Sequence, residues 1–80
     1  MRADVIRAEV FRMVRQAPFR PFALSLENGD RVTIGHPENI AFEPEVESFD
    51  FYVIAGGVRL FGTFDAVSSV AMADSIEHLA

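Results

Sequence analysis

The chain of 80 residues contains no cysteine and no lysine. Without cysteine it can form neither a disulfide bond nor a thiolate metal site, so a domain this small depends on packing or on self-association for its stability. No apolar run approaches the roughly 20 residues that a membrane helix needs, and residues 1–16 interleave charged and apolar side chains instead of forming the apolar core of a signal peptide. These absences predict a cytoplasmic protein with a single domain over residues 1–80 and no membrane partner.

Groups of residues that would support catalysis or metal binding are also lacking. The serines lie in no nucleophile motif. His36 and Glu38 offer two ligands where a metal site needs three or four. Gly56-Gly57 is too short to cradle a phosphate and is explained by a hairpin turn. We therefore predict no catalytic residue, no metal, no cofactor and no enzymatic activity.

Charge is distributed unevenly along the chain. Residues 1–24 carry five arginines and two carboxylates, a net +3, whereas residues 25–80 carry two arginines and ten carboxylates, a net −8. A basic footprint is the usual mark of nucleic-acid binding. Such a footprint is confined here to the N-terminal segment, and the acidic remainder disfavours RNA.

Half of the residues are hydrophobic, and their spacing predicts a helix followed by strands. Apolar residues recur at three- and four-residue intervals over residues 3–16, which predicts a helix that Pro18 ends. The stripe comprises Ala3, Ile6, Val10, Met13, Val14 and Ala17. The opposite face carries Arg12 and Arg15 and is interpreted first as a solvated face.

Alternating apolar residues then predict two hairpins. The first joins residues 22–27 to residues 31–34 through Asn28-Gly29, a pair favoured in type I′ turns. Residues 35–39 break the alternation as a bulge or bend. Further strands are expected at 40–42, 49–54, 58–64 and 66–70. The tail, residues 71–80, is expected to form a frayed turn or short helix capped by Asp74.

The expected fold is mainly β within the α+β class: helix 3–16, then a strongly bent five-stranded antiparallel barrel, Sm-like or SH3-like, over residues 21–70. Several apolar residues do not fit into a single small core, among them Val5 and Phe11. Together with unprotected strand edges they predict self-association. The predicted oligomer interface consists of Tyr52, Ile54, Phe61 and Phe64.

The order of these elements resembles the Sm-like fold of Sm, Lsm and Hfq proteins. Residues 22–32, FALSLENGDRV, resemble the first Sm hairpin, residues 40–42 its third strand, and residues 64–70, FDAVSSV, the short closing strand of Hfq. The pattern PFRPF…NG…HPE also resembles a group of small uncharacterised bacterial proteins. The Sm-like resemblance implies a homo-oligomeric ring of five to seven subunits built by edge-strand pairing. Phe64 and Asp65 stand where Hfq has a basic pair, so Hfq-type uridine binding is not implied.

Three functions follow as hypotheses. The first is a non-enzymatic ring that acts as a scaffold or protein-interaction module. The second is an RNA-binding ring that uses the arginine face of the helix, with possible RNA-binding residues Arg7, Arg12, Arg15, His36 and Asn39. The third is an accessory protein whose acidic face mimics nucleic acid.

Overall fold

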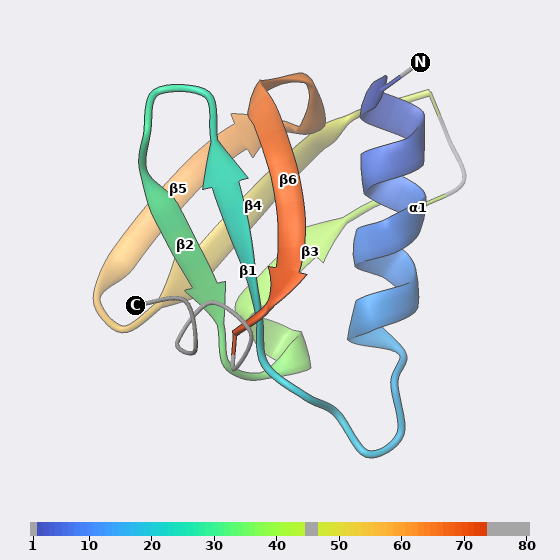
Figure 1. Ribbon diagram of the computed structural model, residues 1–80, viewed down its shortest axis with the longest axis vertical. Helices are drawn as coiled ribbons and strands as arrows, with labels where there is room; N and C mark the ends of the chain where they lie inside the picture. Colours follow the sequence, from blue (N-terminus) through green and yellow to red (C-terminus); the bar gives the residue numbers. More distant parts are fainter. Residues whose placement is uncertain (1, 45–46, 74–80) are drawn as a thin grey trace.

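The computed structural model of the protein describes residues 2–44 and 47–73. Figure 1 shows the order of elements: α1 (Arg2–Val14), β1 (Phe22–Leu26), β2 (Arg31–Ile34), the 3-10 helix η1 (Pro37–Asn39), β3 (Ile40–Phe42), β4 (Asp50–Ala55), β5 (Val58–Thr63), the 3-10 helix η2 (Phe64–Ala66) and β6 (Val67–Met72). The predicted α+β class, with one helix preceding the strands, is confirmed. The predicted cap at Asp74 lies outside the described residues, and Ala71 and Met72, predicted to belong to the tail, extend strand β6 instead. In the described ranges no helix has the length and apolar character that a membrane span requires.

The strands form two antiparallel sheets of three strands each, in the orders β2-β1-β6 and β3-β4-β5. The sheets are not closed into one barrel. The described residues contain six strands, near the six segments expected from the sequence, so the predicted five-stranded barrel is not confirmed. At residues 35–39, η1 turns the chain from one sheet into the other and separates β2 from β3. The last strand, β6, pairs with β1, with Phe22 opposite Met72 and Leu24 opposite Val70.

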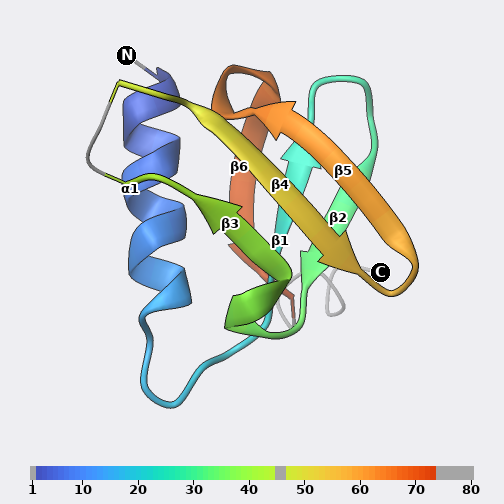
Figure 2. The same cartoon turned by 180° about the vertical axis from the view of Figure 1, so that it is seen from behind.

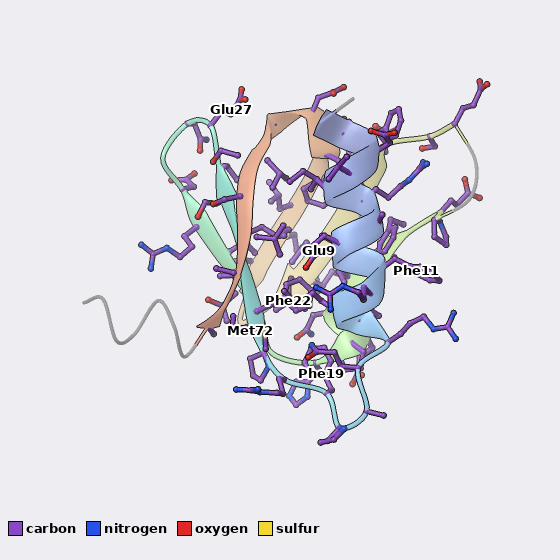
Figure 3. The ribbon with its side chains drawn as sticks, turned by 45° about the vertical axis from the view of Figure 1, so that its right-hand side comes forward. Glu9, Phe11, Phe19, Phe22, Glu27 and Met72 are labelled. Carbon is purple, nitrogen blue, oxygen red and sulfur yellow. The ribbon has the colours of Figure 1, made fainter. Side chains whose placement is uncertain are left out.

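A row of phenylalanine rings connects the helix to β3, η2 and β4. Phe11 of α1 meets Phe42 of β3 edge-to-face at 6.4 Å between ring centroids, and Phe42 meets Phe64 in the same way at 5.4 Å. Phe64 lies 4.8 Å from Phe51 of β4. Such aromatic pairs add about 0.5–1.5 kcal/mol each beyond the area they bury. Phe11, which the sequence left without a place in the core, is therefore half-buried against it (Figure 3).

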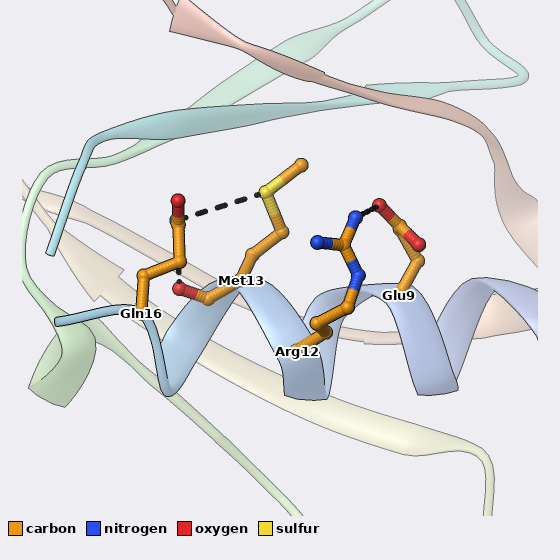
Figure 4. Close-up of polar contacts among 4 residues, drawn as sticks. All are labelled: Glu9, Arg12, Met13 and Gln16. Atoms are coloured by element: carbon orange, nitrogen blue, oxygen red, sulfur yellow. Dashed lines mark hydrogen bonds and ion pairs between the residues drawn. The ribbon is translucent and has the colours of Figure 1, made fainter.

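Helix α1 packs on β6 and η2, and Figures 1 and 2 show it beside β6 and β3, along one side of the two sheets. Its buried residues Ala3, Val10 and Met13 belong to the predicted stripe. The helix ends at Val14, where the Gln16 side chain donates a hydrogen bond to the Met13 carbonyl at 3.0 Å (Figure 4). Ala17, predicted as the end of the stripe, follows the helix and is exposed.

The two hairpin turns differ from each other, and only the first differs from the prediction. Between β1 and β2, Gly29 has a φ of 97° while Asn28 has a negative φ, so the expected type I′ turn at Asn28-Gly29 is wrong. The Gly29 N–H donates to the Leu26 carbonyl at 3.0 Å, which gives a three-residue loop. Between β4 and β5, Gly56 and Gly57 have φ values of 57° and 84°. Both central residues there have the positive φ that a type I′ turn requires.

Candidate functional site

The helix arginines contact the protein's own residues to different extents. Arg7 is half-buried, donates to the Ser48 carbonyl at 2.6 Å and lies 4.5 Å above the centre of the Phe49 ring. Arg12 forms an ion pair with Glu9 one turn earlier on the helix, although 68% of its side chain is exposed (Figure 4). Arg7 thus joins α1 to the segment before β4, whereas the guanidinium of Arg12 remains accessible.

Arg15, the third predicted phosphate contact, is exposed at the end of the helix. Its guanidinium carbon lies 5.2 Å from the centre of the Phe11 ring. This distance is within the range of a cation–π contact, which contributes about 0.5–1 kcal/mol at an exposed site. The arrangement explains an arginine at this position without an external ligand.

His36 precedes the short helix η1, and Asn39 is its last residue and has a clear structural role. Its side-chain oxygen accepts a hydrogen bond from the His36 N–H at 2.9 Å, and its side-chain nitrogen donates to the Ile54 carbonyl of β4 at 3.0 Å. The amide thus fixes the bend between the sheets. His36 is exposed at the N-cap position of η1.

The apolar residues predicted at an oligomer interface fall into two groups. Tyr52, Ile54 and Phe61 lie on the outer face of β4 and β5 and are 39%, 50% and 70% exposed. Tyr52 and Phe61 are cross-strand partners, with ring centroids 6.3 Å apart. We call these three residues the aromatic face.

The fourth predicted interface residue, Phe64, is 1% exposed and belongs to the core. Its N–H donates to the Phe49 carbonyl at 2.8 Å, and η2 begins at this residue after the N-cap Thr63. Since alternate residues of β5 face opposite ways, Phe64 follows Leu60 and Gly62 to the inner side of the sheet. The prediction that Phe64 lies in an oligomer interface is therefore wrong.

A groove of about 640 Å³ opens between the two sheets, with β2 on one side and β5 on the other. Figures 1 and 2 show β2 and β5 on the side of the molecule opposite α1. Val32 and Leu60 line the groove, and Arg31 and Arg59 lie at it together with His36 and Asn39. None of the helix arginines lines it, so the five residues predicted to bind RNA do not form one site.

Sequence reasoning did not select Arg31 or Arg59, although one signal was available. They are the only basic residues of residues 25–80, in a segment that carries ten carboxylates. Their distance in sequence hid their common location, because only the packing of one sheet on the other brings β2 near β5.

In the described part of the chain, no group of three or more His, Asp or Glu side chains is placed to hold a metal ion. The chain was also compared with protein-family models, with curated proteins and with solved structures, and none of the three comparisons found a match. The resemblance to Sm-like proteins consequently remains a prediction from the sequence.

Proposed function

We propose that this protein is a non-enzymatic, Sm-like module that assembles into a homo-oligomeric ring and acts as a scaffold or protein-interaction module. The observation that carries the proposal is the aromatic face, which lies on a sheet whose outer strand β5 has only one hydrogen-bonded neighbour within the described residues. An exposed strand edge beside exposed aromatic side chains favours pairing with another chain.

The strand connections support the Sm-like part of the proposal. The first strand, β1, lies between β2 and the last strand, β6, and the bend at η1 carries the chain from β2 in one sheet to β3 in the other. A strongly bent small barrel has this arrangement of strands, with the bend shared between two halves of the sheet. The two separate ladders correspond to such a barrel opened between its halves.

Substitution of Phe61 tests self-association. Burying a phenylalanine side chain contributes about 1.5–3 kcal/mol, and this contribution is lost when a carboxylate must enter the interface. At micromolar concentration, light scattering should give a multiple of 8.9 kDa for the wild type and a monomer for Phe61→Glu. Val5→Glu is the matched control, because Val5 is 65% exposed on α1, away from the aromatic face. A monomeric wild type, or an oligomer unaffected by Phe61→Glu, would contradict the proposal.

The alternative, RNA binding through the arginine face of the helix, has less support. Arg7 is occupied by the Ser48 carbonyl and the Phe49 ring, and Arg12 is paired with Glu9. We therefore retain only the scaffold or interaction role as the proposed function.

A further inference from the structure

We propose that the groove between β2 and β5 binds an extended peptide that alternates acidic and apolar residues and adds as a strand to the free edge of β2. This inference rests on the protein-interaction role proposed above and names the class of partner. The peptide pairs with the free edge of β2, whereas the aromatic face lies on β4 and β5, although Arg59 at the groove is the cross-strand partner of Ile54 of that face. Peptide binding and ring formation therefore need separate readouts, anisotropy for the first and light scattering for the second.

The groove lies at the one long side of the sheet pair that the described residues leave open. Helix α1 runs along the opposite side, beside β6 and β3 (Figures 1 and 2). At the groove, β2 has β1 as its only hydrogen-bonded neighbour in the described part of the chain, and β5 has only β4. An edge strand with an adjoining cavity is the arrangement that peptide recognition by strand addition requires.

The register shows which backbone groups of β2 face a partner. The Leu26 N–H donates to the Asp30 carbonyl at 2.8 Å, which makes these two residues a hydrogen-bonded pair of the β1–β2 ladder. Hydrogen-bonded and non-hydrogen-bonded pairs alternate along antiparallel strands. Val32 therefore directs its backbone toward β1, while the N–H and C=O groups of Arg31 and Thr33 point toward the free edge. A strand added there finds two residues ready to pair.

The side chains around the groove indicate the character of that strand. Val32 and Leu60 supply an apolar lining between the sheets, so inward residues of the peptide should be apolar. Arg31 and Arg59 lie at the same groove, both exposed, and neither guanidinium has a hydrogen-bonded or ionic partner among the described residues. One carboxylate, Asp30, also lines the groove, and it accepts a hydrogen bond from the Asn28 side chain at 3.3 Å, so the groove carries two arginines against one carboxylate.

Charge complementarity thus selects an acidic peptide in preference to a basic one. The two arginines are the whole positive charge of residues 25–80, and both are placed at this groove. Because side chains of a strand alternate between its two faces, acidic residues at every second position can reach the arginines while the apolar residues enter the groove.

The test uses the full chain and a fluorescein-labelled hexapeptide of alternating glutamate and valine. Fluorescence anisotropy of the labelled peptide, with the protein titrated to about 1 mM, detects weak binding. We expect saturable binding that weakens about tenfold in the double variant Arg31→Gln/Arg59→Gln, as the loss of two partly exposed ion pairs predicts. The matched control, Arg12→Gln/Arg15→Gln, removes the same charge from the helix and should bind as the wild type does.

A second variant tests strand addition itself. Thr33→Pro removes an N–H from the free edge of β2 while leaving both arginines in place, and proline is tolerated where the N–H of an edge strand faces solvent. It should abolish peptide binding with unchanged circular dichroism. In the wild type, the largest amide shifts on peptide addition should fall on Arg31 and Thr33 by NMR. If Thr33→Pro unfolds, these shifts and the arginine variants still decide the question.

Several results would overturn the inference: no binding of the glutamate–valine peptide, equal binding of a lysine–valine peptide, equal weakening by the helix control, or shifts confined to another surface. Binding of a uridine hexamer at the groove in place of the peptide would assign the site to nucleic acid instead. Light scattering on the same samples separates the two proposals, because a monomer that binds the peptide contradicts only the ring, and a ring that does not bind it contradicts only the peptide site.

Discussion

Individual side chains in this small domain are constrained most tightly where the aromatic rings meet. Phe51 is 2% exposed and stacks on Phe64, which is itself fully buried. Opposite Phe51 in the β4–β5 ladder lies Gly62, and a Cβ added there would come within 3.2 Å of the Phe51 ring. The glycine therefore leaves room for the Phe51 ring.

The substitution Gly62→Ala should accordingly destabilise the protein. The new methyl group has to displace a ring that is held by Phe64, and overpacking of this kind costs about 1–3 kcal/mol. Urea denaturation measures the change. Gly35→Ala is the control, since the nearest atom to its added Cβ is the Asn39 side-chain oxygen at 3.9 Å, an ordinary contact. If Gly62→Ala is as stable as Gly35→Ala, the Phe51 ring can move aside without cost.

Among the elements, the bend at η1 has the greatest effect on the architecture, because it transfers the chain from one sheet to the other. Pro37 begins the short helix. The Asn39 side chain accepts a hydrogen bond from the His36 N–H before the helix and donates one to the Ile54 carbonyl of β4. One of these hydrogen bonds closes η1 and the other joins it to β4, while the ladder between β3 and β4 sets their register. The sequence placed a break here but did not reveal what holds it.

Replacing Asn39 separates the two hydrogen bonds. Asn39→Ala removes both and should lower the free energy of unfolding by about 1–3 kcal/mol, at roughly 0.5–1.5 kcal/mol for each bond. Asn39→Asp keeps the acceptor for the His36 N–H but loses the donor to the Ile54 carbonyl. Denaturant midpoints should show both variants below the wild type, with Glu38→Ala, an exposed neighbour, unchanged. If Asn39→Ala is as stable as the wild type, the Asn39 hydrogen bonds do not stabilise the bend.

For the whole molecule, the surfaces left uncovered matter more than any single contact. Within the described residues, β2, β3, β5 and β6 each have one hydrogen-bonded neighbour, and α1 lies along the β6 and β3 side. The aromatic face and the groove between β2 and β5 lie on or beside the edges that α1 does not cover, those of β2 and β5. An 80-residue chain with half of its residues hydrophobic gains stability if one of these surfaces is covered by another copy.

Self-association predicts a thermal midpoint that depends on protein concentration. Mass action stabilises the folded oligomer as concentration rises, and in a domain of this size each kcal/mol gained raises the midpoint by roughly 4–8 °C. Differential scanning calorimetry over a hundredfold dilution should show this shift for the wild type and Val5→Glu. The midpoint of Phe61→Glu should be independent of concentration. A constant midpoint for the wild type would argue against an oligomer.

Much of the secondary structure follows from sequence pattern alone. The period of the apolar residues determines α1, and their alternation determines strands at β1, β2, β4 and β5, because each element has to place its apolar side chains on one side. The same alternation left Tyr52, Ile54 and Phe61 outside the core, and they are exposed. The sequence pattern determines these features because they depend only on residues a few positions apart.

Tertiary structure alone decided the rest. The place of Phe64 in the core depends on rings from β3 and β4, and the groove exists because β2 and β5, about 27 residues apart in sequence, form opposite walls between two sheets. The common location of Arg31 and Arg59 at this groove has the same origin. No periodicity records such a meeting, since it is produced by the packing of one sheet on the other and not by the local spacing of residues.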